Sequence, residues 1–404
     1  MRFAVLCDDP LARPVVEALG VEAGGSQLNY AVRMTPRSHE LVGARNALAL
    51  VNHWEDLLVA KELDVVLFGG SDPLMLEGAK QLATAGISLL FVPQAAQGST
   101  FVYELSLIRD DNNVLLFPLL WHRFDAAVIA VKRALEEGRW GRVQFLQFQR
   151  TLSQPSTSTP VGQAVVDAEL LNDTDLLRWL IGDYDQVTAL RTAATEAGVL
   201  LQSVVLAGRS LPEANWSIAP IDGPGQSRLI IRAEQCVVEL QRDESSRCWN
   251  CRIDGQRIEG DESSTARSAL EAFAASNSHD RTGGTAQRGT VSSDWGELVK
   301  CFETVDATHR SIRRRRTIEL HFEPMSERAI FKTQMTAIGC GLLMATLFLT
   351  LCFLGIASVL PLPPQVLVGL RILVFAPLVL FLLAQILLPL TRPSSNDKSQ
   401  SPRG

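Results

Sequence analysis

The sequence predicts an α/β protein with an N-terminal doubly wound parallel sheet, a second α/β domain with a mainly antiparallel open sheet, and then two transmembrane helices. Three observations support this. Short apolar runs alternate with helical patterns up to about residue 120, longer alternating strands follow, and two long apolar stretches come near the C-terminus. The 404 residues suffice for roughly two to three domains, and 47% hydrophobic against 20% charged residues excludes a largely disordered chain.

The first domain is expected over residues 1–120. Its opening strand, Phe3–Cys7, precedes Pro10, which suits the first turn of a helix that ends near Gly20. The elements that follow are strands at 28–34, 64–68 and 88–92, with a helix at 73–85 closed by Gly86. Strands that alternate with helices in this way indicate a parallel sheet with helices on both faces.

The second domain is expected over residues 121–323. A helix at 126–137 leads into longer alternating strands such as Val143–Arg150 and Ser227–Leu240, a pattern typical of an antiparallel sheet. Residues 261–293 are rich in Ser, Thr, Gly and Ala and hold few large apolar side chains. This segment therefore predicts a mobile loop.

Charge and cysteine content narrow the class of protein. The 38 Lys and Arg residues against 44 Asp and Glu give a net charge of −6, so no nucleic-acid partner is expected. Seven scattered cysteines argue against a disulfide framework and favour a reducing compartment. Cys248 and Cys251 have zinc or redox spacing, but without a second Cys or His pair nearby we expect strand packing and no metal site.

Two apolar stretches, residues 335–360 and 366–390, each exceed the roughly 20 residues that a helix needs to cross a bilayer. They predict a transmembrane hairpin at 335–390, with the lipid bilayer as partner. Two buried helices of a water-soluble core are the alternative, but such helices rarely run this long without a polar face. A stripe of small residues, Ala337, Gly341 and Ala345, favours packing against the second span or against a second copy in a homo-oligomer.

Basic residues flank both spans: Arg313–Arg316 and Lys332 precede the first, and Arg392 follows the second. The positive-inside rule then places the body, the juxtamembrane segment 324–334 and a disordered tail at 391–404 in the cytoplasm. The expected location is the cell (inner) membrane, as a multi-pass protein. The arginine run is expected to meet anionic headgroups rather than nucleic acid.

Several landmarks recur in a fixed order between residues 1 and 322. They include Trp121-His122-Arg123-Phe124, Gly138-Arg139-Trp140-Gly141 and the stretch Asp175–Gly182. In this order the chain resembles the Gfo/Idh/MocA family, the glucose-fructose oxidoreductase and inositol dehydrogenase group of NAD(P)-dependent sugar enzymes. The resemblance implies a Rossmann-like NAD(P)-binding-type domain, a second α/β domain, NAD or NADP as cofactor, and a sugar-like small-molecule ligand.

The nucleotide motif departs from the family pattern. Members carry Gly-x-Gly-x-x-Gly/Ala, but the matching run here is Cys7-Asp8-Asp9-Pro10-Leu11-Ala12, in which only Ala12 satisfies the pattern. Asp8 and Asp9 set carboxylates where phosphate charge would lie, and Pro10 lacks an amide donor. Arg33 or Arg37 remains as a partner for the 2′-phosphate of NADP. By position, the resemblance assigns cofactor contacts to Cys7, Asp8, Asp9, Leu11, Ala12 and Pro93.

The catalytic positions depart as well. Where the family has Glu-Lys-Pro, this chain has Phe91-Val92-Pro93, so Val92 stands in place of the proton-handling lysine. The acid-base histidine of the family, three residues before an aspartate, is Asn172, while Asp175 is retained. Neither valine nor an amide transfers a proton near neutrality. The remaining catalytic candidates are Asp175 and His122, although a capping or packing role for His122 is equally open.

Joint loss of the phosphate turn, the lysine and the histidine favours a membrane-anchored pseudoenzyme, a non-catalytic metabolite sensor or scaffold on an oxidoreductase fold. The alternative is an active NAD(P)-dependent oxidoreductase on a sugar or polyol-like substrate, with Asp173 and Arg123 supporting substituted catalytic residues. Binding of the cofactor distinguishes the two.

Overall fold

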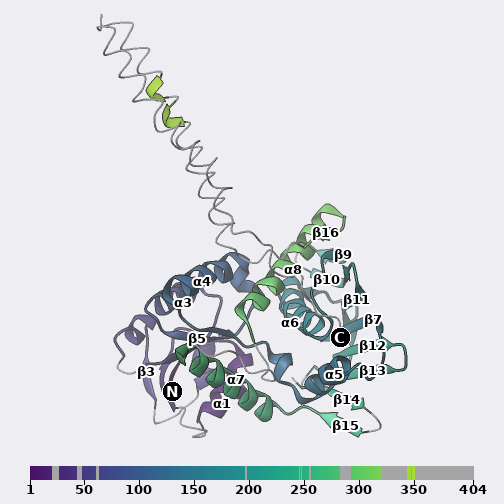
Figure 1. The fold of residues 1–404 in the computed structure, drawn as a ribbon, viewed down its shortest axis with the longest axis horizontal. Helices are drawn as coiled ribbons and strands as arrows, with labels where there is room; N and C mark the ends of the chain where they lie inside the picture. Colours follow the sequence, from purple (N-terminus) through teal and green to yellow (C-terminus); the bar gives the residue numbers. More distant parts are fainter. Residues whose placement is uncertain are drawn as a thin grey trace, which may run out of the picture. The chain divides into compact units, whose positions relative to one another are not determined.

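The computed structural model describes residues 1–20, 27–42, 48–60, 63–195, 198–244, 246, 248–253, 256–282, 293–320, 344–346 and 348–350. The chain divides into two units, Met1–Phe322 and Glu323–Gly404. All the elements described below belong to the first unit (Figure 1).

The first sheet is entirely parallel and confirms the predicted N-terminal architecture. Its order is β3-β2-β1-β4-β5-β6. A parallel sheet covered on both faces needs apolar side chains on both, and β1 and β4 are almost completely buried. The strands are β1 (Arg2–Cys7), β2 (Gln27–Val32), β3 (Ala49–Val51), β4 (Val65–Gly69), β5 (Ser88–Phe91) and β6 (Leu116–Pro118).

Helices cover both faces of this sheet (Figure 1). The helices α3 (Pro73–Thr84) and α4 (Gly98–Asn112) lie on one face, and α1 (Arg13–Gly20) and α7 (Glu262–Thr282) lie on the other. Each face has its own apolar core. Shorter elements connect the strands, namely η1 (Pro10–Ala12), α2 (Pro36–Val42), η2 (Trp54–Leu57) and η3 (Ala95–Gln97).

Helix α7 corrects the prediction of a mobile loop at 261–293. Residues 262–282 are helical, and Ala266, Ala269 and Phe273 are fully buried. The Phe273 ring centroid lies 6.0 Å from that of Phe3 and 5.6 Å from that of Phe117. Ala266, Ala269 and Phe273 form a narrow apolar stripe on one side of the helix. Because most other residues of the segment are polar or small, its composition did not indicate an amphipathic helix. Residues 283–292 lie outside the described part of the chain.

The second sheet is mixed but mainly antiparallel, as predicted. The order along its main path is β15-β14-β13-β12-β7-β11-β10-β9-β16, and only β7 and β11 pair in parallel along that path. Its strands are β7 (Val143–Gln154), β8 (Val161–Gly162), β9 (Gln186–Thr195), β10 (Gly198–Gly208), β11 (Leu211–Asp222), β12 (Gln226–Ala233), β13 (Val237–Asp243), β14 (Asn250–Ile253), β15 (Gln256–Glu259) and β16 (Ile318–Glu319).

The single long strand expected at Ser227–Leu240 is a hairpin instead. Strand β12 ends at Ala233 and β13 begins at Val237, and the Ala233 amide donates to the Cys236 carbonyl over 2.9 Å. The two halves carry separate runs of alternating side chains, with no Gly or Pro between them to mark the turn in the sequence.

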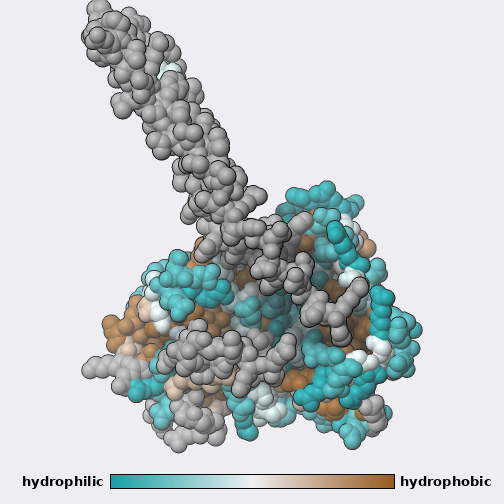
Figure 2. Space-filling view, in the orientation of Figure 1, coloured by the Kyte–Doolittle hydropathy of each residue, from teal (hydrophilic) through white to brown (hydrophobic). Residues whose placement is uncertain are grey.

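Four helical elements pack with the second sheet: η4 (Trp121–Phe124), α5 (Ala126–Glu136), α6 (Gln163–Ile181) and α8 (Trp295–Arg314). Helix α8 contacts α6 and β9, and it also contacts α4 and β6 of the first half. Residues on both sides of the predicted domain boundary at 120/121 therefore belong to one unit. On the face seen in Figure 2, hydrophilic residues surround smaller hydrophobic areas of the described surface.

Among the residues described, no helix combines the length and apolar character needed to cross a membrane. The predicted hairpin at 335–390 lies outside the described residues except for 344–346 and 348–350. The juxtamembrane segment 324–334 and the tail 391–404 lie outside them entirely.

Candidate functional site

A cavity of about 720 Å³ lies between the carboxyl ends of the parallel strands and the helix-covered face of the second sheet. The loops after β1, β4, β5 and β6 line one end, with Asp8–Leu11 and Val92–Ala96 among their residues. Helix α6 and strands β7, β12 and β13 line the other. Open α/β sheets bind ligands at this edge, beside the point where strand order reverses between β1 and β4.

In the turn after β1, the side chain of Asp9 binds a backbone amide of the same turn. Asp9 is the N-cap residue of η1, and its Oδ1 accepts a hydrogen bond from the Leu11 amide over 2.7 Å. The other carboxylate oxygen, Oδ2, accepts from Gln94 Nε2 over 2.8 Å. The Ala12 amide donates to the Asp9 carbonyl over 3.0 Å, and Pro10 has no amide hydrogen. The donors that would hold a phosphate at this helix start are thus already engaged.

These residues do not fit the pyrophosphate of a dinucleotide. Asp8 lines the cavity beside Asp9, and burial, followed by the charge of Asp9, raises the pKa of Asp8. Carboxylates at a phosphate position repel the ligand, most strongly where water is excluded. Of the residues that the resemblance assigns to the cofactor, Leu11 and Pro93 line the cavity, whereas Cys7 and Ala12 are fully buried and are not among its lining residues.

Both positions that carry catalytic residues in the family line the cavity. The Val92 side chain is buried at its wall, and Asn172 of α6 donates from Nδ2 to the Ala168 carbonyl of the same helix over 3.1 Å. The structure thus brings Val92 and Asn172 together at one cavity. Neither side chain transfers a proton near neutral pH.

His122 of η4 is buried at the cavity wall with a defined tautomer. Its Nδ1 accepts a hydrogen bond from Trp249 Nε1 over 3.0 Å, so in the neutral ring the proton lies on Nε2. That Nε2 has no hydrogen-bond partner among the described residues, and Asp173 Oδ1 lies 3.8 Å away. Burial, and then the charge of Arg242, lowers the pKa of His122 well below its ordinary value. His122 is therefore neutral at pH 7.

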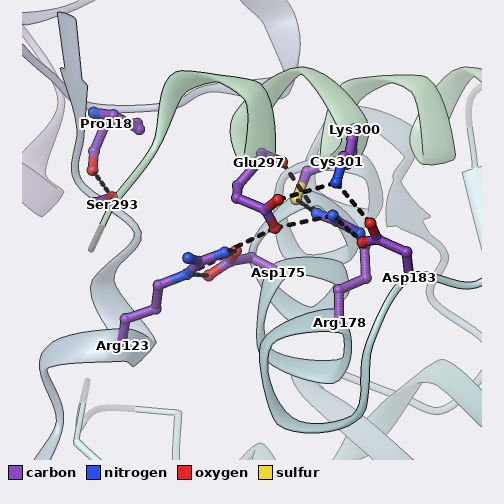
Figure 3. A network of polar contacts seen from close by, with 9 residues as sticks. All are labelled: Pro118, Arg123, Asp175, Arg178, Asp183, Ser293, Glu297, Lys300 and Cys301. Carbon is purple, nitrogen blue, oxygen red and sulfur yellow. Dashed lines mark hydrogen bonds and ion pairs between the residues drawn. The ribbon is translucent and has the colours of Figure 1, made fainter. Parts of the chain in front are cut away.

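Asp175 belongs to an ion-pair network instead of the cavity lining (Figure 3). Its Oδ1 accepts from Arg123 Nη2 over 2.6 Å, and the same arginine contacts Glu297 of α8 over 3.4 Å. Glu297 also binds Arg178 over 2.9 Å. Since Arg123 follows His122 directly in η4, this network fixes the segment that carries the imidazole between α6 and α8.

The sequence analysis missed a row of three polar residues across the second sheet. Ser227 of β12 pairs with Arg150 of β7 on one side and with Arg242 of β13 on the other. Directly paired residues share a face, and all three residues line the cavity. The signal was present in the sequence: each arginine falls in step with the buried positions of its alternating strand, as at Leu146 and Phe148 before Arg150.

The two arginines have different surroundings. Arg150 is 4% exposed and binds Asp173 Oδ1 over 2.6 Å and Glu169 Oε2 over 2.9 Å. Arg242 lies over the ring of Trp249, with Cζ 5.1 Å from the centroid, and makes no hydrogen bond or ion pair with any residue that the structure describes. Burial, and then the charge of Arg150, lowers the pKa of Arg242 to about 10, so the guanidinium remains charged at neutral pH.

The paired cysteines behave as packing residues. Cys248 and Cys251 are buried free thiols; Cys251 Sγ lies 3.8 Å from the Ala127 carbonyl, and Cys248 Sγ lies 3.9 Å from Thr265 Oγ1. Burial raises the pKa of both thiols. Within the described ranges, no group of three or more His, Cys, Asp or Glu side chains is placed to hold a metal ion.

A parallel sheet of this order, a second open sheet and a cavity between them make up a fold that is similar to that of solved dehydrogenases. Solved structures agree. A putative myo-inositol dehydrogenase from Sinorhizobium meliloti is similar at a TM-score of 0.63 and 17% identity, over 80% of this chain and 100% of that one. A WlbA dehydrogenase from Chromobacterium violaceum, solved with NADH and UDP-GlcNAcA, is similar at a TM-score of 0.61 and 18% identity, over 80% of this chain and 97% of that one.

The myo-inositol 2-dehydrogenase from Lactobacillus plantarum gives a TM-score of 0.61 and 14% identity, over 80% of this chain and 99% of that one. These neighbours are dehydrogenases of the Gfo/Idh/MocA type, and at these identities they show the fold. No family model matches the sequence. No curated protein matches it either.

Proposed function

We propose that this protein is a non-catalytic metabolite sensor or scaffold that uses the cavity of an oxidoreductase fold to bind a small molecule. One observation carries the proposal: the Asp9 carboxylate accepts from the Leu11 amide and from Gln94, at the place where a dinucleotide phosphate would bind. The replacements at Val92 and Asn172, both at the cavity, support it.

Titration with NADH tests this proposal. We expect the full chain to leave nicotinamide fluorescence unchanged up to hundreds of micromolar NADH, and likewise for NADPH, because two carboxylates face the phosphate position. Asp9→Gly should make binding detectable, since it removes one carboxylate and frees the Leu11 amide. Saturable binding by the unchanged protein in the low micromolar range would contradict the proposal.

The chain offers a matched control for the lost helix cap. Asp72 precedes Pro73-Leu74 just as Asp9 precedes Pro10-Leu11, and it caps α3 through the Leu74 amide over 2.9 Å. Asp72 is not a cavity-lining residue. Asp72→Gly should therefore weaken a helix start by a similar amount without any gain in NADH binding.

A second candidate is an NAD(P)-dependent oxidoreductase on a sugar or polyol-like substrate. It is favoured by His122, whose Nε2 hydrogen at the cavity wall has no partner among the described residues. In this candidate His122 would orient a substrate hydroxyl in place of the altered groups. Its lowered pKa makes the ring a hydrogen-bond donor at neutral pH and a weak base. The NADH titration separates this candidate from the first.

We also propose that the protein is anchored in the cell membrane by residues 335–390, with its body in the cytoplasm. Support comes from the length and apolar character of the two stretches and from the basic residues around them. Such an anchor would hold a metabolite-binding body at the membrane surface, where a sensor could act on neighbouring proteins.

A further inference from the structure

The second-sheet end of the cavity presents hydrogen-bond donors without acceptors. Arg242 makes no hydrogen bond or ion pair with the described residues, and its Nε is buried. The Nε2 hydrogen of His122 has no hydrogen-bond partner among the described residues, and the nearest carboxylate oxygen given for it, Asp173 Oδ1, lies 3.8 Å away. Both side chains contact Trp249: Arg242 lies over its ring, and His122 meets it edge-on at 5.8 Å between centroids. The indole thus holds a cationic and a neutral donor near each other.

A half-buried guanidinium that no carboxylate binds directly is partly removed from water, and an anionic ligand would offset the cost of that desolvation. Arg150, the other arginine of the row, is occupied by Asp173 and Glu169. Of the carboxylates that line this end, Glu169 is bound to Arg150, and Glu244 accepts from the Ser153 amide over 3.0 Å. Arg242 is therefore the arginine at this end of the cavity that no described carboxylate binds directly, although the charges of Asp173 and Glu169 act on it from nearby.

This charge balance selects the kind of anion. A planar, singly charged carboxylate matches one guanidinium fork, whereas a phosphate dianion would bring a second charge toward Glu169 and Glu244. Neutral hydrogen-bonding side chains surround the remaining space and suit a hydroxylated body: Thr151, Gln154, Asn172, Ser227 and Ser246.

We propose that this end of the cavity binds the carboxylate of a small hydroxylated acid, held by Arg242 with His122 Nε2 as second donor. The proposal rests on the proposed function, because it names the ligand class of the same cavity. Trp249 is the positioning residue of the site, since it orients both donors.

Calorimetric titration of the full chain with D-gluconate and D-sorbitol tests the proposal. These probes differ only in a carboxylate against a neutral hydroxymethyl group. We expect gluconate to bind on the order of tenfold or more tightly than sorbitol, as for a hydrogen bond to a charged group. Arg242→Gln should remove that preference and leave weak sorbitol binding unchanged, and Arg242→Lys should retain part of it.

Arg228→Gln is the matched control, because Arg228 lies on the neighbouring strand β12, is exposed, and binds Glu239 over 2.9 Å. It should leave the preference intact. Equal binding of the two probes, binding of neither, or a preference that survives Arg242→Gln would overturn the proposal. So would tighter binding of inorganic phosphate than of gluconate. If Arg242→Gln does not fold, the comparison of gluconate and sorbitol binding to the unchanged protein still tests whether the cavity prefers a carboxylate.

Parallel titration with NADH keeps the two proposals apart. Gluconate preference together with tight NADH binding would refute the non-catalytic function and leave the carboxylate site standing. Absence of both would refute the carboxylate site alone.

Discussion

The neutral ring of His122 makes stability depend on pH in a direction that can be measured. Burial, then Arg242, lowers its pKa in the folded protein, while on unfolding the ring regains an ordinary value of about 6.5. Below that pH the unfolded state therefore binds more protons, and stability falls as the pH falls. Relative to His122→Asn, which keeps an acceptor for Trp249, the unchanged protein should lose stability as the pH falls from 7 to 5.

Urea unfolding at several pH values measures this difference, and His309 supplies a control of opposite sign. Its Nε2 lies 3.0 Å from Asp167, and the hydrogen bond with that carboxylate raises its pKa. The contribution of His309 is present below pH 6.5 and is lost as the pH rises through the raised value. Relative to His309→Asn, the unchanged protein should therefore lose stability toward alkaline pH. A pH-independent difference for His122→Asn would contradict its neutral burial.

Single residues were predictable where a motif named them and not where only the fold brought them together. The run Cys7–Ala12 predicted an altered phosphate turn, because all the residues of that turn are consecutive in the sequence. The hydrogen bond from Gln94 to Asp9 joins residues 85 positions apart in the sequence. Arg242 could be recognised as a cavity residue only once the fold paired it with Ser227 and placed it over Trp249. Asp175 resembled a catalytic group in sequence, but its partner Arg123 is 52 positions away.

Among the elements, α7 has the clearest energetic consequence. Phe273 is fully buried between α7 and the first sheet, against Phe3 and Phe117. Phe273→Ala should lower the free energy of unfolding by about 3–5 kcal/mol, because it leaves a cavity under the helix. The midpoint of urea unfolding of the full chain, followed by tryptophan fluorescence, measures the loss.

Glu271→Ala on the same helix is exposed and serves as the control, with an expected change within about 0.5 kcal/mol. Equal midpoints for Phe273→Ala and Glu271→Ala would mean that α7 contributes nothing to the core of the first sheet.

Elements with strong periodicity were predicted within a few residues, including β1, α3, β5 and α5. They combine apolar runs with clear boundary residues, such as Gly86 after the end of α3 and the N-cap residue Asp125 before the start of α5. Helix α7 was missed because its buried face is made mostly of alanine, which composition does not distinguish from a loop. The hairpin β12-β13 was missed because Glu234-Gln235-Cys236 lacks the residues that usually mark a turn.

At the scale of the whole molecule, the proposed anchor predicts how the protein partitions in a cell. The full chain should stay with membranes through alkaline carbonate washing, because two apolar helices inside a bilayer are not released by loss of charge contacts. A chain truncated after residue 322, which ends with the first compact unit, should remain in the supernatant. Release of the full chain by carbonate would contradict membrane spanning and leave only surface attachment.

The return of α7 to the first sheet has a consequence for synthesis on the ribosome. Strand β6, with Phe117, emerges about 150 residues before Phe273, on the order of ten seconds or more at usual elongation rates. During that interval the nascent chain carries all six parallel strands while one aromatic face still lacks its cover. The N-terminal half therefore cannot complete its core before α7 leaves the exit tunnel, and until then that face is open to chaperones or to neighbouring nascent chains.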